Sequence, residues 1–399
     1  MKLDHEGPLS GVRVIDIGTM VAGPVAATLL ADFGANVIKV EQPGLGDTLR
    51  HLGPFDGGES LWWNVEGRNK KSITLDLRQP EGQRLLKELV KHADVLVENF
   101  RPGTLDRWNL SWKELEQVNP QLVMLSVSGY GQTGPYASRA GYDRMGLALG
   151  GVMGISGYPD RPPVRPGTAV ADYQTALFGA FGTMVALHDR DVNGGTGQQV
   201  DLSLFESVFR FTETLVTAYD KLGLKRERTG NIHPSAAPCD HFETADGRYI
   251  ALAINSERMY LRLCEVLPEL VGDPRFATRE DRVANVDAIN QVVATWTKSM
   301  PVPQLCGILD DAGLAYAMIY SVEDIVEDPQ YEARGTIISV DNPRLGTLRM
   351  PAPQPNLSKT PAPDVRPAPE LGADTAEVLR EVLGLSDEEI DALRLSDVI

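Results

Sequence analysis

One carboxylate in this chain has an unusual setting. Asp172 begins a segment, Asp172 to Leu187, that is apolar on nearly every side and rich in Gly and Ala. Such a segment is typical of a buried helix whose neighbours approach closely. An aspartate at a helix start is often only an N-cap, but the free amide groups there also stabilise a negative charge. Asp172 is therefore the first candidate for a nucleophile.

A second chemical signal is the run Arg68-Asn69-Lys70-Lys71, just before a predicted strand. Such a run is usually a solvated surface. Its other interpretation is phosphate capture, with Arg78, Arg101 and Arg107 as further candidates. Because the chain has a net charge of −17, any anionic ligand needs a local basic patch of this kind.

Three other chemistries are not expected. Gly129 to Gly134 matches G-x-G-x-x-G, but Pro135 follows where a dinucleotide site needs a helix. The turn Gly18 to Pro24 lacks the Lys-Ser/Thr of an ATP loop, although its amides could still face a phosphate or pantetheine. His233, Cys239, Asp240 and His241 have no zinc spacing, and no G-x-S-x-G is present, so neither a metal site nor a serine nucleophile is predicted.

The composition is that of a globular protein that does not bind polyanions. Because the net charge is −17, neither nucleic acid nor an anionic membrane is an expected partner. The three cysteines are far apart, which favours reduced thiols in a cytoplasmic protein. The N-terminus has no signal-peptide profile, and no apolar run is long enough to predict a membrane span.

Strands alternating with helices predict an α/β fold: a doubly wound, mostly parallel sheet in a large domain, with a smaller α+β domain. The predicted strands are 12–17, 35–40, 72–77, 94–98, 122–127 and 199–202, and the predicted helices are 25–33, 81–92, 112–117, 145–154 and 172–187. A loop at 226–240, a hairpin at 242–250 and helices within 257–309 indicate the second domain. We expect domains at 1–215 and 235–330.

The last part, 340–399, is predicted to return to the large domain. Seven prolines between Pro351 and Pro369 indicate an extended strap. Two capping signals, Asp374-x-x-Glu377 and Ser386-x-x-Glu389, then predict a pair of C-terminal helices.

Several motifs occur in the order typical of one family. They are Ala22-Gly23-Pro24, Gly34 to Glu41, Asn69 to Leu77, Ala93-Asp94-Val95-Leu96-Val97-Glu98-Asn99-Phe100-Arg101-Pro102-Gly103, Ser128 to Pro135, Gly141-Tyr142-Asp143, Asp172 and Gly195-x-Gly197-Gln198. On these motifs the chain resembles the class III CoA-transferases, the CaiB/BaiF type that includes formyl-CoA transferase and carnitine CoA-transferase. The resemblance covers nearly the whole chain and is strongest over residues 11–205.

The resemblance implies an interlocked homodimer, in which two subunits thread through each other, and it implies that Asp172 is the nucleophile. It further implies contacts to CoA from residues throughout the first half of the chain: Val21, Ala22, Gln42, Leu75, Asp76, Leu77, Arg78, Asn99, Phe100, Arg101, Arg107, Ala140, Gly141, Tyr142 and Asp143. At two of these positions, Gln42 and Ala140, the formyl-CoA transferase pattern has arginine and lysine. Formyl-CoA transferase, for which oxalate is the acceptor, covers its site with a glycine-rich loop. Here a segment with Asn231 and His233 takes the place of that loop, and we expect this segment to act as a lid near the substrate.

The expected reaction moves CoA from an acyl-CoA to a carboxylic acid through an aspartyl anhydride and an aspartyl-CoA thioester. Coenzyme A is then a substrate, with no tightly bound cofactor, and Asp172 is expected to be ionised at neutral pH. Succinyl-CoA with a small dicarboxylic or hydroxy acid is the expected pair. An α-methylacyl-CoA racemase is the alternative, although the histidine of its Gly-His-Asp motif is Tyr142 here. A silent subunit of a heteromer is a third interpretation.

Overall fold

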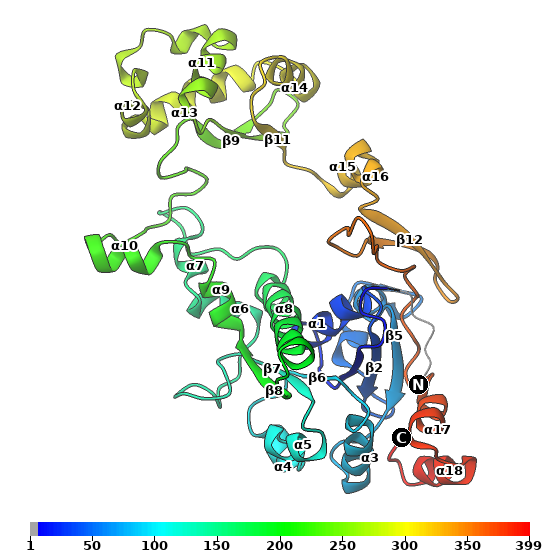
Figure 1. Cartoon of the computed structure of the whole chain (residues 1–399). Coiled ribbons are helices and arrows are strands. Elements are labelled where there is room, and N and C mark those ends of the chain that lie inside the picture. Colours follow the sequence, from blue (N-terminus) through cyan, green and yellow to red (C-terminus); the bar gives the residue numbers. More distant parts are fainter. Residues whose placement is uncertain (1–6) are drawn as a thin grey trace. The chain divides into compact units, whose positions relative to one another are not determined.

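The computed structural model describes residues 7–399 and divides the chain into two compact units (Figure 1). The first unit combines the residues up to Val152 with Arg165–Thr214 and Arg334–Ile399. The second unit combines Met153–Val164 with Leu215–Ala333. The first unit is therefore built from both ends of the sequence, and the second is inserted between them.

A six-stranded sheet is the centre of the first unit. Its strands, in chain order, are β1 (Arg13–Asp16), β2 (Asn36–Glu41), β5 (Lys70–Thr74), β6 (Val95–Glu98), β7 (Val123–Ser128) and β8 (Gln198–Ser203). Their spatial order is β5-β2-β1-β6-β7-β8, and every neighbouring pair is parallel. The prediction of an α/β fold with a mostly parallel sheet is confirmed. Because the chain leaves β1 first toward β2 and later continues on its other side with β6, the β1–β6 boundary is a topological switch point.

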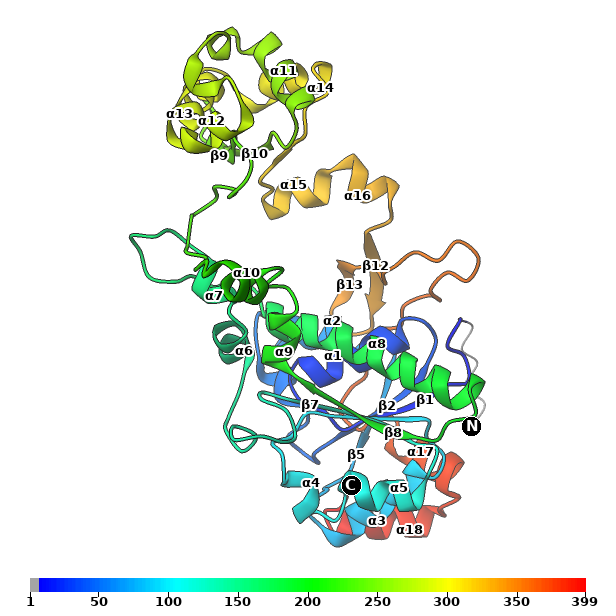
Figure 2. The same cartoon turned by 60° about the vertical axis from the view of Figure 1, so that its left-hand side comes forward.

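Helices cover both faces of this sheet (Figure 2). On one face, α1 (Ala22–Ala31) and α8 (Val170–Val192) pack on the valines of β6 and β7. On the other face lie α3 (Pro80–Val90), α4 (Thr104–Arg107), α5 (Trp112–Val118), α17 (Thr375–Leu383) and α18 (Asp387–Leu395). All strands except the edge strand β8 are almost entirely buried, because helices cover both of their faces.

The remaining elements of the first unit are short. They are β3 (Phe55–Asp56), β4 (Glu59–Ser60), α2 (Leu61–Glu66), α6 (Asp143–Leu149), α9 (Leu204–Phe209), β12 (Ile337–Asn342) and β13 (Gly346–Pro351), with α7 (Val152–Ile155) beginning at its boundary. The proline-rich segment between β13 and α17 contains no helix or strand. Its Arg366 amide donates to Asn69 Oδ1 at 2.8 Å, which attaches the segment to the start of β5.

The two C-terminal capping signals have different outcomes. Ser386 and Glu389 form a reciprocal capping box at the start of α18, as predicted. Asp374 does not cap α17 with its side chain. Its carboxylate instead accepts from the Ser72 amide of β5 at 2.8 Å, so it ties the tail to the sheet.

The second unit contains a three-stranded antiparallel sheet in the order β11-β10-β9, covered by helices around its own apolar core. Its strands are β9 (Cys239–Glu243), β10 (Tyr249–Ala253) and β11 (Tyr316–Met318). Its helices are α10 (Leu215–Leu222), α11 (Glu257–Val266), α12 (Arg279–Ala284), α13 (Val286–Thr297), α14 (Val302–Asp311), α15 (Val322–Glu327) and α16 (Pro329–Ala333). In the part of the chain that is described, no helix combines the length and apolarity needed to cross a bilayer.

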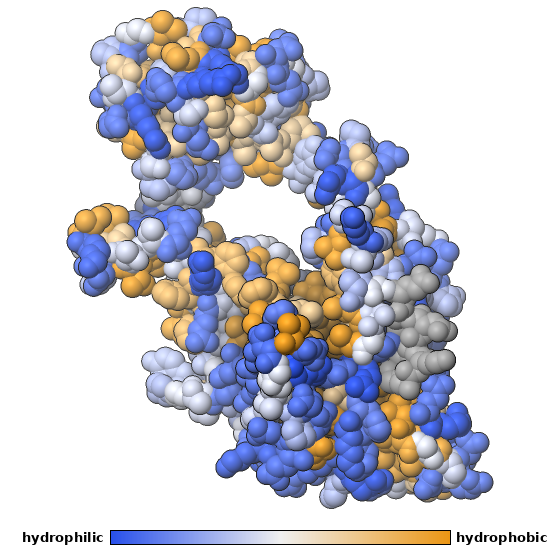
Figure 3. Space-filling view, in the orientation of Figure 1, coloured by the Kyte–Doolittle hydropathy of each residue, from blue (hydrophilic) through white to orange (hydrophobic). Residues whose placement is uncertain are grey.

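The expectation that α8 is buried all round is wrong. One face of α8 packs on α1, α9 and β7, but Leu177, Phe181 and Val185 are 60%, 67% and 52% exposed. Their spacing of four residues places them in one stripe along the helix. Hydrophobic surface accordingly gathers over α8 (Figure 3). Within the described residues, this apolar face of α8 thus has no cover.

Candidate active site

A cavity of about 230 Å³ lies at the carboxyl ends of β1, β6 and β7. It is lined by the turn Thr19–Ala22 after β1, by Asn99–Pro102 after β6 and by Val127–Gly129 at the end of β7. Asp172, from the first turn of α8, closes the cavity together with Tyr142. Ligands of open α/β sheets bind at such a switch point, because the loops after the two central strands diverge there.

Asp172 is the third residue of α8, since the helix begins at Val170 and not at Asp172 as predicted. Its side chain is half-buried, and no group in residues 7–399 forms a hydrogen bond or ion pair with its carboxylate. Burial and then the negative charge of Asp143 raise the pKa of Asp172 to about 7. The raised pKa departs from the expectation that this carboxylate is fully ionised at neutral pH, because the pKa lies close to neutral pH.

Asp143 fixes the start of the same helix. Its Oδ1 accepts from the Ala171 amide at 2.7 Å, so α8 is capped by a carboxylate from another segment. The N-cap position itself is Ala169, which has no side chain for this purpose. Asp143 thus has two effects on Asp172: it holds the first turn in place, and its charge disfavours ionisation of the neighbouring acid.

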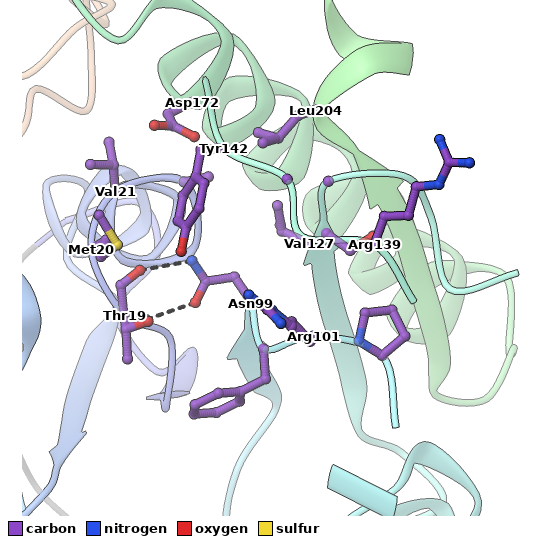
Figure 4. Close-up of a pocket in the computed structure, with 16 residues that line it drawn as sticks. Thr19, Met20, Val21, Asn99, Arg101, Val127, Arg139, Tyr142, Asp172 and Leu204 are labelled. Carbon is purple, nitrogen blue, oxygen red and sulfur yellow. Dashed lines mark hydrogen bonds between the residues drawn. The ribbon is translucent and has the colours of Figure 1, made fainter. Parts of the chain in front are cut away.

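The two central loops are held together by one asparagine. Asn99 Oδ1 accepts from the Thr19 amide, and Asn99 Nδ2 donates to the Thr19 carbonyl, both at 2.7 Å (Figure 4). A Cβ on Gly23 would lie 3.2 Å from Asn99 Cγ, so this glycine allows the start of α1 to approach the pair. Val21 and Ala22, at the start of α1, line the cavity that contains Asp172, so the positive end of this helix lies at the cavity.

A second cavity, of about 150 Å³, shares Thr19 and Phe100 with the first. It lies at the carboxyl ends of β1, β2 and β5 and is lined by Gln42 and by Leu75–Arg78. Arg78 is held by a bidentate pair with Asp76, with both contacts at 2.8 Å. The two cavities are therefore neighbours, and together we call them the groove; Asp172 lines the first of them.

The structure gathers most of the sequence-predicted residues along this groove. Val21, Ala22, Asn99, Phe100, Arg101, Gly141, Tyr142 and Asp172 line the first cavity, and Gln42, Leu75, Asp76, Leu77, Arg78 and again Phe100 line the second. Ala140 and Arg107 are exposed and line neither cavity. Asn231 and His233 belong to the second unit, where Asn231 donates to Tyr158 Oη at 3.1 Å, and their role as a lid stays a prediction.

The phosphate-capture interpretation of Arg68, Lys70 and Lys71 is wrong. Arg68 and Lys70 are buried and paired inside the protein, Arg68 with Asp32 at 2.6 Å and Lys70 with Asp16 at 2.9 Å. Lys71 pairs with a glutamate of α17. These cations therefore compensate buried carboxylates and have no free charge to offer to a ligand.

Lys70 belongs to a buried network under the turn after β1. Asp16 accepts from the Gly18 amide at 2.9 Å, and Lys39 lies between Asp16 and Asp47. Asp47 in turn accepts from the Met20 amide at 2.8 Å. Burial lowers the pKa of Lys70, although the charge of Asp16 opposes this effect. The network holds the backbone of Gly18 to Met20 beneath the groove.

Gly129 and Gly141 explain the glycine-rich motif after β7. A Cβ on Gly129 would lie 2.7 Å from the Gly141 Cα, and one on Gly141 would lie 2.6 Å from the Gly129 Cα. The two backbones are in direct contact, which leaves no space for a side chain at either position. The motif therefore packs the segment that carries Tyr142 and Asp143 against the end of β7, instead of binding a dinucleotide.

Sequence reasoning assigned no contact to Ser128, Arg139 and Leu204 of the first cavity, and it named Thr19 and Met20 only as part of the turn Gly18 to Pro24. Ser128 is the last residue of β7, so the rule that parallel strands present their carboxyl ends to ligands could have indicated it. Arg139 stacks on Tyr136, and no sequence signal connects it with Asp172. In residues 7–399, no cluster of three or more His, Cys, Asp or Glu side chains could hold a metal ion.

Comparison with known proteins identifies many relatives. The family model described as CoA-transferase family III matches residues 9–375. A succinyl-CoA–D-citramalate CoA-transferase of Chloroflexus aurantiacus is 44% identical over 98% of both chains. The beta subunit of a succinyl-CoA–L-malate CoA-transferase from the same organism is 43% identical, also over 98% of both chains. A mouse succinyl-CoA:glutarate CoA-transferase is 36% identical over 99% of this chain and 91% of its own.

A solved structure has the same fold. A CaiB/BaiF family protein from Brucella suis superposes with a TM-score of 0.85 at 35% identity, covering 94% of this chain and all of the other.

Proposed function

Because this chain belongs to CoA-transferase family III, we propose that it moves coenzyme A from succinyl-CoA to a small dicarboxylic or hydroxy acid, with Asp172 as the covalent carrier. The observation that carries this proposal is the carboxylate of Asp172, unbonded within the described residues, in the first cavity of the groove. Relatives named for D-citramalate, L-malate and glutarate all use succinyl-CoA by name, which supports the choice of donor.

In the proposed reaction one acyl-CoA thioester is converted into another, through an anhydride and a thioester of Asp172. The ionised Asp172 attacks the thioester carbonyl, forms an acyl–aspartyl anhydride and releases CoA as its thiolate. The thiolate attacks the aspartyl carbonyl, which gives aspartyl-CoA and frees the donor acid. The carboxylate of the acceptor repeats both steps in reverse, so that a new acyl-CoA leaves and Asp172 is restored.

The groove supplies what this chemistry requires. Each attack creates an oxyanion, and we propose that backbone amides at the start of α1, where Val21 and Ala22 line the cavity, stabilise it. By the family resemblance, the second cavity takes the nucleotide end of CoA, with Gln42 and Leu75–Arg78 as contacts. Because anhydride and thioester both react with water, we propose that the segment with Asn231 and His233 covers the site during turnover.

A panel of donors and acids tests the function. We expect the purified chain to form new acyl-CoA from succinyl-CoA and malate, citramalate or glutarate, with parallel double-reciprocal plots, because the donor acid leaves before the acceptor binds. Oxalate should be a poor acceptor. Chromatographic detection of the CoA products measures each pair. Deuterium uptake at the α-carbon of a 2-methylacyl-CoA, without any transfer, would instead indicate a racemase.

We also propose that two copies interlock. The exposed stripe of Leu177, Phe181 and Val185 on α8 supports this, since apolar patches of this kind usually face a partner. Light scattering of the purified chain should give twice its mass of 43.5 kDa. A single-chain mass would contradict the dimer, and activity only after addition of a second, related chain would indicate a heteromer.

A further inference from the structure

A third cavity lies beside the cavity that contains Asp172, and the proposed function leaves its ligand open. Its volume is about 580 Å³, and it shares the Tyr142 ring with the cavity that contains Asp172. Its walls include Trp62 and Tyr173, and Thr168 and Ala169 immediately before α8. All of these residues belong to the first unit. The cavity therefore lies beside the groove, at the start of the helix that carries Asp172.

Two arginines give this cavity a positive charge. Arg144 and Arg165 both line it, and both are exposed. No group in residues 7–399 forms an ion pair or hydrogen bond with Arg144, and Arg165 donates only to the Pro166 carbonyl, at 2.8 Å. Asp143, the acid in the same wall, is already bonded to the Ala171 amide. In a chain with a net charge of −17, two guanidinium groups without carboxylate partners beside the reaction centre are available to an anion.

The aromatic walls are held rigidly. Trp62 Nε1 donates to Tyr173 Oη at 3.1 Å, and Tyr173 Oη donates to Glu66 Oε1 at 2.8 Å. This chain of hydrogen bonds orients both rings, so the cavity offers two preformed aromatic walls together with Tyr142 and the two arginines. A short methylene chain that ends in a charged group matches this arrangement.

The proposed function determines which part of the substrate reaches this cavity. CoA occupies the groove that contains Asp172, so the acyl group attached to its sulfur must continue beyond the carboxylate. Resting on that function, we propose that Arg144 and Arg165 bind the distal carboxylate of a dicarboxylic acyl group. The donor acid leaves before the acceptor arrives, so one subsite serves the donor and the acceptor in turn. The pair thereby selects dicarboxylic over monocarboxylic acids.

The test compares acids that differ only in the distal carboxylate. Arg144→Gln, Arg165→Gln and the double variant are assayed at pH 8, where Asp172 is ionised, with succinyl-CoA as the donor. Isotopically labelled succinate, glutarate and butyrate are the acceptors, so that exchange of succinate into succinyl-CoA is also detected. Loss of a charge-assisted hydrogen bond should raise KM for succinate and glutarate by about 10- to 100-fold in each single variant. The KM for butyrate should stay unchanged. Arg144→Lys should restore part of the affinity, because lysine keeps the charge but not the bidentate geometry.

Arg349→Gln is the matched control, because it removes one exposed positive charge from β13, which lines none of the three cavities. It should leave every KM unchanged. Two results would contradict the proposed subsite but not the proposed function. One is an equal rise in KM for butyrate and succinate, and the other is unchanged KM values for the dicarboxylic acids in the double variant. If the unmodified protein transfers CoA to no acid at all, the proposed function fails, and the subsite fails with it.

Discussion

Asp172→Ala should lower CoA transfer by about 10³-fold or more, because it removes the only group proposed to form the covalent bond to the acyl carbon. The fold should not change, since the carboxylate of Asp172 has no bonded partner within the described residues that would be left behind. Affinity for free CoA should also be retained, because Gln42 and Leu75–Arg78 line a separate cavity. Turnover of succinyl-CoA with malate and calorimetric titration with CoA measure the two quantities.

The matched controls separate the nucleophile from its neighbour. Asp172→Asn keeps the shape of the side chain and should be as inactive as Asp172→Ala, whereas Asp143→Asn should remain active. In the unmodified protein, hydroxylamine or borohydride added together with acyl-CoA should modify residue 172, as detected by mass spectrometry of peptides. Turnover of Asp172→Ala above the hydrolytic background, or trapping at another residue, would rule out this assignment.

The pH profile should have an acidic limb near the pKa of Asp172. Only the ionised carboxylate attacks, and burial with the charge of Asp143 raises its pKa to about 7. For a carboxylic acid the charged form dominates above the pKa, so kcat/KM for succinyl-CoA should fall as pH decreases. At pH 6 about one tenth of the sites are ionised, and kcat/KM should be about one tenth of its value at high pH. A profile that is flat between pH 5.5 and 8 would contradict this assignment.

Asp143→Asn tests the electrostatic part of that effect. The amide that replaces the carboxylate would retain an oxygen for the Ala171 amide, so α8 should stay capped while the like charge is removed. The pKa of Asp172 should then decrease, and the ratio of activity at pH 6 to activity at pH 8 should rise. The burial effect, which is the larger cause, remains. Asp189→Asn, on the same helix but about 25 Å from Asp172, is the control and should leave the ratio unchanged.

The order of strands and helices could be predicted because the strands of the central sheet, apart from the edge strand β8, are buried on both faces. Runs such as Val12 to Ile17 and Leu122 to Val127 are mostly apolar and include β-branched residues, which is typical of buried strands. The start of α8 was less accurate, at Asp172 instead of Val170, because its cap comes from Asp143 and not from a local side chain. A cap that comes from a distant segment leaves no local pattern.

The ionic states of single residues could not be predicted from the sequence. Arg68 and Lys70 have the composition of a solvated or anion-binding run, yet each meets a carboxylate inside the fold, Asp32 and Asp16, more than thirty residues away. Asp172 has an ordinary side chain whose raised pKa depends on burial and on Asp143. Both effects follow from tertiary contacts, which neither periodicity nor local propensity encodes.

The single predicted helix at 145–154 is divided into α6 and α7 for a similar reason. A Cβ on Gly150 would lie 2.6 Å from Val208 Cβ, so α9 passes too close for an ordinary residue there, and Gly151 then adopts a φ of +89°. Close contact between helices thus decided where the first helix ends. The sequence showed the two glycines, but it did not show that α9 would lie against them.

The contact between Gly129 and Gly141 also determines which positions near the active site can accept substitutions and which cannot. Any side chain at either glycine would push Tyr142 and Asp143 away from the sheet and so displace the helix start that holds the reacting carboxylate. Arg144, three residues beyond Gly141, is exposed and has no such restriction. Descendants of this protein can therefore acquire new acid preferences through substitution at this exposed position, while the reaction that they share stays fixed.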